Sequence, residues 1–180
     1  MDLPVARTLH LAECGPDSTW VFGYGSLVSP ASLASTIGRH VGPDDVAIAH
    51  LDGYGRRWNY GSKVLRGDWV HDGRNIVGGL VVSLGIAAAE DESCNGVVFD
   101  VDDDELAALD WRERDYERVD ITDVTTVDVD RFDGQVQVYV PRPSSIERYE
   151  LARNEGRAAI RQSYWTLVED AFASLGGAGG

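Results

Sequence analysis

Cysteine and histidine are scarce in this sequence, and their scarcity excludes two kinds of stabilising chemistry. Cys14 and Cys94 are the only cysteines among 180 residues, too few for a disulfide framework, and they fit a reduced, cytoplasmic setting. The four histidines are scattered and form neither an H-x-x-x-H nor a C-x-x-C pattern, so we expect no metal ion. A chain of this length buries about two-thirds of its unfolded surface and needs no such staple.

Basic side chains are also in short supply. Sixteen lysines and arginines stand against thirty aspartates and glutamates, which gives a formal net charge of −14. Such a surface repels phosphate backbones and anionic lipids, so we expect neither a nucleic acid nor a membrane as a partner.

Long apolar runs are missing as well. No run of 18 apolar residues is available to cross a bilayer, and the N-terminal segment lacks the basic start and apolar stretch of a secretory signal. Apolar residues still make up 43% of the chain, which is typical of a globular protein. We therefore expect a cytoplasmic protein with a single domain over residues 19–174, an N-terminal extension over residues 1–18 and a flexible tail over residues 175–180.

Strand-like segments make up most of the rest. Residues 19–24, 46–60, 75–84 and 95–101 are apolar, alternating or β-branched runs that predict strands. Asp133-Gly134 predicts a two-residue hairpin turn between an alternating segment that ends near Val129 and a return strand through Val136, Val138 and Val140.

Capping residues predict where the helices begin. Ser29 before Pro30 starts one helix, which Gly38 ends, and two capping boxes start others, Asp102 with Glu105 and Ser144 with Glu147. A final helix presents Ile160, Tyr164, Leu167, Val168 and Ala171 to the core. Strands outnumber helices and short turns join them, so we expect the α+β class, with a mixed sheet or small barrel and helices outside it.

The bend between the first strand and the first helix is a candidate binding site. Gly23 and Gly25 let the backbone approach a ligand, and the following helix start suits a small anion such as a carboxylate. The dinucleotide fingerprint fails because its third glycine position is Val28. A plain tight turn explains the same glycines, and spacing alone does not exclude it.

A second candidate lies where the Asp102 helix ends. A Glu113 side chain turned toward Trp111 and Tyr116 would have its pKa raised by desolvation, which would prepare it for proton transfer near neutral pH. The alternative is a solvated surface cluster of acidic and basic residues.

Four segments, taken together, carry a resemblance to a known family. They are Val21-Phe22-Gly23-Tyr24-Gly25-Ser26-Leu27, Asn59-Tyr60-Gly61-Ser62 with Arg66-Gly67, Leu109-Asp110-x-Arg112-Glu113-x-x-Tyr116, and Tyr149 seven residues before Gly156. They resemble, in this order, the Y-G-S-[LN] loop, an aromatic–Ser…Arg-Gly stretch, the segment with the catalytic glutamate and a pocket tyrosine of the γ-glutamylcyclotransferase family, including its ChaC-type, glutathione-degrading branch. The resemblance covers roughly residues 19–172.

The resemblance implies a small mixed β-barrel with flanking helices and a reaction that needs no cofactor. In that reaction the α-amine of a γ-glutamyl amine or peptide attacks its own γ-amide carbonyl, which yields 5-oxoproline and a free amine. Glu113 would be the general acid/base. The glutamyl part would be bound by Val21, Phe22, Gly23, Tyr24, Gly25 and Ser26, with Tyr116 and Tyr149 bordering the pocket and Arg112 as a salt-bridging scaffold residue.

Two other functions use the same pocket. One is a non-catalytic module that binds a small carboxylate, and the other is a hydrolase or amidotransferase in which the nucleophile comes from outside the substrate. The group on the γ-amide would be contacted by loops over residues 62–75 and 85–93, the second a hairpin tip or a pocket lid. The oligomeric state leaves no readable trace in the sequence.

Overall fold

The computed structural model describes residues 19–129 and 132–176 of the chain. The expected N-terminal extension and the last four residues of the expected tail lie outside the described residues. The single-domain boundary at residues 19–174 stays a prediction.

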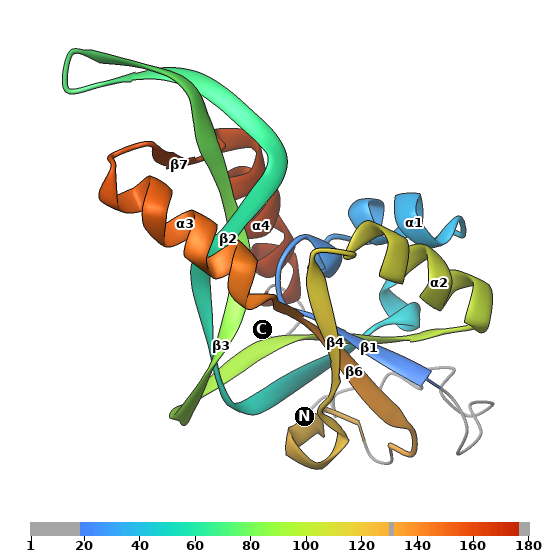
Figure 1. Cartoon of the computed structure of the whole chain (residues 1–180). Helices are drawn as coiled ribbons and strands as arrows, with labels where there is room; N and C mark the ends of the chain where they lie inside the picture. The colour runs from blue at the N-terminus through green and yellow to red at the C-terminus, as the bar shows by residue number, and fades with distance from the viewer. Residues whose placement is uncertain (1–18, 130–131, 177–180) are drawn as a thin grey trace, which may run out of the picture.

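Seven strands form one sheet (Figure 1). They are β1 Thr19–Gly23, β2 Ala47–His71, β3 Arg74–Val101, β4 Tyr116–Asp120, β5 Thr125–Val127, β6 Gln135–Pro141 and β7 Ala158–Ile160. Their order is β4-β6-β1-β3-β2-β5, with β7 paired to β3. The β1–β6 and β3–β7 pairs are parallel, and the other pairs are antiparallel. The α+β class is confirmed, but the pairings among the described strands do not close the sheet, so "barrel" describes it only loosely.

Four α-helices flank the sheet. They are α1 Pro30–Ile37, α2 Asp103–Arg112, α3 Pro143–Asn154 and α4 Gln162–Gly176, with short 3₁₀ turns at η2 Ser26–Val28, η3 Pro43–Asp45 and η4 Thr122–Val124. Figure 1 shows α1 and α2 together on one side of the molecule and α3 and α4 on the other. No helix in the described part of the chain is long and apolar enough to cross a membrane.

The central strand β1 is buried on both faces. Successive side chains of a strand point to opposite faces, so Trp20 and Phe22 enter one core cluster while Val21 enters the other. This explains why β1 is an unbroken apolar run and not an alternating one. The strand ends at Gly23, which places the following bend at the boundary between the two clusters.

The predicted starts of two helices and the predicted end of one of them are confirmed. Ser29 caps α1 with its Oγ, which accepts from the Ser32 N–H at 3.4 Å, and Gly38 ends it at φ +79°. Asp102 and Glu105 form the expected capping box of α2. The box expected at Ser144 is wrong, because α3 begins one residue after Arg142, which provides no side-chain cap.

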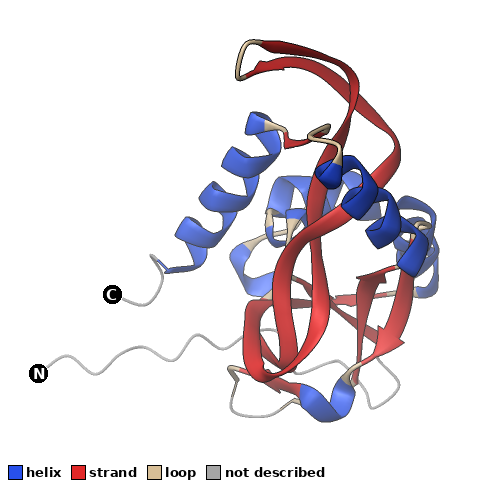
Figure 2. Cartoon of the chain, turned by 60° about the vertical axis from the view of Figure 1, so that its left-hand side comes forward, coloured by secondary structure: helices blue, strands red, loops and turns tan. Residues whose placement is uncertain are grey.

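The two loops expected over residues 62–75 and 85–93 are largely strand, so that prediction is wrong. β2 and β3 pair along nearly their whole length, and four register shifts absorb the irregular stretches. Only Asp72 and Gly73 form the turn, both at positive φ, as a tight hairpin requires. The tip of the resulting β2–β3 hairpin projects beyond the helices at the top of Figure 2.

The hairpin expected at Asp133-Gly134 is also wrong. β5 pairs with β2, whereas β6 pairs with β4 and β1. The 3₁₀ turn η4 interrupts the alternating segment, so its two halves join different neighbours. A local turn motif therefore did not decide the pairing here.

Gly96→Ala tests the packing that supports the end of β1. A Cβ at Gly96 would overlap the Gly23 carbonyl oxygen and the Phe22 ring, because β3 crosses β1 closely there. We expect a loss of about 1–3 kcal/mol in the free energy of unfolding, the usual cost of overpacking. Urea denaturation of both proteins measures it.

Gly67→Ala is the matched control, since its added Cβ would meet no atom closer than 3.7 Å. It should leave stability unchanged or raise it by up to about 1 kcal/mol through the unfolded state. Equal effects of the two substitutions would contradict the close β1–β3 approach.

Candidate active site

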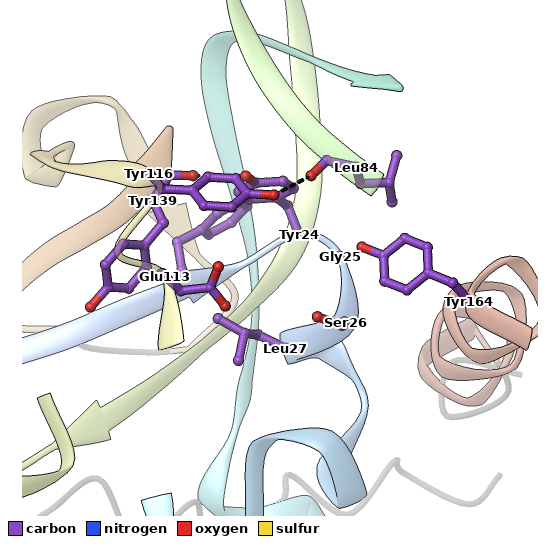
Figure 3. Close-up of a pocket in the computed structure, with 10 residues that line it drawn as sticks. Tyr24, Gly25, Ser26, Leu27, Leu84, Glu113, Tyr116, Tyr139 and Tyr164 are labelled. Carbon is purple, nitrogen blue, oxygen red and sulfur yellow. Dashed lines mark hydrogen bonds between the residues drawn. The ribbon is translucent and has the colours of Figure 1, made fainter. Parts of the chain in front are cut away.

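A pocket opens where the chain leaves β1 (Figure 3). Its walls come from β1, η2, β3, β4, β6 and α4, together with the bend after β1 and the connection between α2 and β4. Its lining residues are Phe22, Tyr24, Gly25, Ser26, Leu27, Leu84, Glu113, Tyr116, Tyr139 and Tyr164. About 330 Å³ of space, including the open mouth, is free of protein atoms.

The bend after β1 packs closely against Leu27 and Tyr164 and is hydrogen-bonded by Arg56. A Cβ at Gly23 would lie 3.1 Å from the Leu27 backbone, and one at Gly25 would lie 3.3 Å from the Tyr164 hydroxyl oxygen. Arg56 Nε donates to the Tyr24 carbonyl at 2.9 Å. Glycine at position 25 therefore leaves backbone, and no side chain, at this wall of the pocket.

Glu113 faces the pocket from the junction of α2 and β4. It is the C-cap of α2, and the fully buried Leu109 fastens the last turn of that helix to the core. The Glu113 N–H donates to the Leu109 carbonyl at 2.8 Å, and its carbonyl accepts from the Tyr116 N–H at 2.7 Å. In Figure 3 the carboxyl points into the space between Tyr24 and the Leu27 side chain.

The Glu113 carboxyl is shielded from water and paired with one cation. Its side chain is 14% exposed, and Arg112 Nε lies 3.0 Å from Oε1. Burial raises the pKa of Glu113 above its ordinary value, and the Arg112 charge offsets part of that rise. A carboxyl in this balance can take up and release a proton at higher pH than a solvated one.

The tyrosines around Glu113 are donors and not bases. The Tyr24 hydroxyl donates to the Tyr139 carbonyl at 2.7 Å, and the Tyr116 hydroxyl donates to the Leu84 carbonyl at 3.1 Å. Burial raises the pKa of both phenols well above the usual value, and it raises that of Tyr164 as well. These groups therefore stay protonated near neutral pH.

A second layer holds Tyr116 in place. The Tyr60 ring stacks on it with centroids 4.4 Å apart and planes 18° apart. Burial, together with the nearby Asp115 charge, raises the pKa of Tyr60 to about 12. Lys63 Nζ in turn binds Asp115 Oδ1 at 2.7 Å, and this pair lowers the pKa of Asp115.

The structure brings most of the sequence-predicted site residues together. Phe22, Tyr24, Gly25, Ser26 and Tyr116 line the pocket with Glu113.

Three predicted residues do not reach the pocket lining. Val21 points into the opposite core cluster, because it alternates with Phe22 along β1. Gly23 supports the bend from behind, against Leu27. Tyr149 lies on α3, whose backbone packs beside Gly61 of β2, and it is not among the lining residues.

Sequence reasoning missed four lining residues, Leu27, Leu84, Tyr139 and Tyr164; of these, Leu27 ends the quoted first motif but was not predicted to bind. Tyr139 lies between Val138 and Val140, so the predicted alternation already placed it on the other face of its strand. Tyr164 belonged to the apolar stripe of the last helix, which was interpreted as core. Leu84 gave no signal, because only the β2–β3 pairing brings it to the pocket.

The described residues contain no group of three or more histidine, cysteine, aspartate or glutamate side chains that could hold a metal ion. Glu113 is the one carboxyl among the lining residues, and Arg112 already occupies one of its oxygens. The chemistry this arrangement supports is proton transfer by a single shielded acid/base.

Comparison with known proteins gives one family and a set of related folds. The model of the ChaC-like protein family matches residues 19–160, so the match ends before α4 and Tyr164. No curated protein matches the chain.

Solved structures are similar at low identity. A yeast γ-glutamyl cyclotransferase specific to glutathione is 13% identical, with 87% of each chain covered and a TM-score of 0.58, which shows a shared fold. A solution structure from Arabidopsis thaliana is 29% identical over 79% of this chain and 78% of that one, with a TM-score of 0.43.

Glu113→Gln tests the burial of this carboxyl through the pH dependence of stability. The folded protein keeps the Glu113 proton to higher pH than the unfolded chain, whose pKa is near 4.5. The stability that this group contributes is therefore complete below that value and is lost as pH rises through the raised folded pKa. Relative to Glu113→Gln, the unmodified protein should lose free energy of unfolding over that interval, as measured by urea denaturation at several pH values.

Glu117→Gln is the control, because Glu117 lies four residues further along at an exposed position of β4. Its free energy of unfolding should change with pH in the same way as that of the unmodified protein. Parallel pH profiles for all three proteins would mean that Glu113 is solvated.

Proposed function

The chain belongs to the ChaC-like protein family, and from that premise we propose that it is a γ-glutamyl cyclotransferase. It converts a γ-glutamyl amine or peptide into 5-oxoproline and a free amine or amino acid. The observation that carries the proposal is the shielded Glu113 carboxyl, which faces a pocket whose opposite wall is the Gly25–Ser26 bend.

The reaction is intramolecular, which suits a small pocket with one acid/base. The α-amine nitrogen forms a bond to the γ-amide carbonyl carbon, and the bond from that carbon to the amide nitrogen breaks. Two protons leave the attacking nitrogen, which starts as an ammonium group, and two reach the departing nitrogen. Glu113 accepts each and passes it on, so its carboxylate is restored at the end.

Fixing one folded conformer of the substrate is the main task left to the protein. The Gly25–Ser26 bend presents backbone to the substrate α-carboxylate, and backbone N–H groups there would also stabilise the developing oxyanion. The ring walls of Phe22, Tyr24 and Tyr116 exclude water, which strengthens both interactions.

The identity of the amine is the finer part of the proposal. The name of the yeast structure says that it is specific to glutathione, which makes glutathione the first substrate to test. γ-Glutamyl dipeptides and γ-glutamyl-lysine derivatives follow. The lining residues would bind the glutamyl part, and the group on the γ-amide would extend through the open mouth of the pocket.

Turnover of these compounds, with 5-oxoproline as the measured product, tests the proposal. Glu113→Gln should lower kcat by about 10²–10⁴-fold, the usual contribution of a positioned acid/base. Glu117→Gln serves as the control and should keep full activity, because its side chain is exposed on β4.

The products separate the proposal from its rivals. Glutamate in place of 5-oxoproline would indicate a hydrolase. Stabilisation against heat by glutamate or 5-oxoproline, with no turnover of any γ-glutamyl compound, would indicate a binding module. Full activity of Glu113→Gln would contradict the role of this residue.

A further inference from the structure

The guanidinium of Arg112 is held inside the protein at all three of its nitrogens, by four hydrogen bonds and one ion pair. Nε binds Glu113 Oε1 at 3.0 Å. Nη1 donates to the Ser32 carbonyl at 3.2 Å and to Thr36 Oγ1 at 2.5 Å. Nη2 donates to Ser26 Oγ at 2.8 Å and to Ser32 Oγ at 3.2 Å. The four N–H donors of the two Nη groups are therefore used within the protein, and Nε faces the Glu113 carboxylate.

These acceptors come from three separate parts of the chain. Glu113 carries the acid/base at the end of α2, Ser26 begins the η2 turn that forms the opposite wall of the pocket, and Ser32 and Thr36 lie on α1. The planar fork therefore fixes the Glu113 carboxyl relative to the bend and anchors both to a helix. At 28% exposure the Arg112 side chain is partly shielded, which strengthens each contact.

We infer that Arg112 is a positioning residue, which sets the distance and orientation of the Glu113 carboxyl relative to the Gly25–Ser26 bend. Arg112 occupies Oε1 and leaves Oε2 for the substrate nitrogen. The catalytic part of this inference rests on the proposed function, whereas the hold on the carboxyl does not.

Geometry and charge make separate contributions and can be separated experimentally. Lysine keeps the positive charge but has no fork, so it cannot contact Glu113, Ser26 and the α1 acceptors at once. Glutamine removes the charge. Glu113 is faced by Arg112 from its own turn and by several phenols. These are Tyr24 from the bend after β1, Tyr60 from β2, Tyr116 from β4, Tyr139 from β6 and Tyr164 from α4. The phenols are neutral near pH 7, so the charge of Arg112 is the one that substitution alters.

The experiment compares Arg112→Lys and Arg112→Gln with Arg114→Gln as the matched control. Arg114 is two residues away and exposed. Its guanidinium lies over the Trp111 ring and donates to the Trp111 carbonyl, and Trp111 does not line the pocket. Arg112→Lys should lower kcat by about 100-fold, the cost of misplacing a catalytic group by about 1 Å, with a much smaller change in KM. Arg112→Gln should also move the acid limb of the pH–rate profile to higher pH, while Arg112→Lys should leave that limb in place.

Thr36→Val adds a variant whose changed atom lies outside the pocket. It removes one hydroxyl that accepts from Arg112 and keeps the volume of the side chain. One lost hydrogen bond to the anchor should lower kcat by about fivefold with the fold intact, as near-ultraviolet circular dichroism would verify.

Titration of the Glu113 carboxyl by ¹³C NMR measures the effect of Arg112 on this carboxyl without a substrate. Its midpoint should rise in Arg112→Gln and stay unchanged in Arg114→Gln. Unchanged kcat in folded Arg112→Lys, or an unchanged midpoint in Arg112→Gln, would overturn the inference. If no γ-glutamyl compound reacts but the midpoint moves, the proposed function fails and the hold of Arg112 on Glu113 stands.

Discussion

A buried carboxyl group either pairs with a cation or takes up a proton at higher pH than a solvated one. Both effects act on Glu113. Burial favours its neutral form, and the neighbouring Arg112 favours its charged form. Neither effect removes the other, so the group can change its protonation state during a reaction. The tyrosines around it stay protonated near neutral pH, so they add no second base.

Each wall of the pocket is supplied by a different element of the fold. β1 is buried on both faces, and its end delivers the bend that forms one wall of the pocket. α2 ends at Glu113, and its buried Leu109 fixes the direction from which the carboxyl enters. The sheet brings β3 and β6 alongside, and α4 closes the far wall with Tyr164. Because each wall comes from a different element, small shifts in packing change the distance between acid/base and bend.

Local chemistry made part of this predictable from the sequence. The caps at Ser29 and Asp102 located the starts of two helices to the residue, and so located the bend before the first of them. Strand pairing was harder, because partners such as β1 and β6 are far apart in the chain and no local pattern specifies them. Tyr139, on β6, was missed for this reason, whereas Tyr164 was missed because it belongs to the apolar stripe of α4. The partners of Arg112 could not be predicted either, since they lie in three segments that only the folded chain brings together.

The most direct measurement is a crystal structure of the Glu113→Gln variant with 5-oxoproline or a γ-glutamyl compound bound. The account predicts the ligand carboxylate against the backbone of the Gly25–Ser26 bend, with the reacting nitrogen about 3 Å from the side chain at position 113. A ligand bound outside this pocket, or a side chain at position 113 turned into solvent, would contradict it.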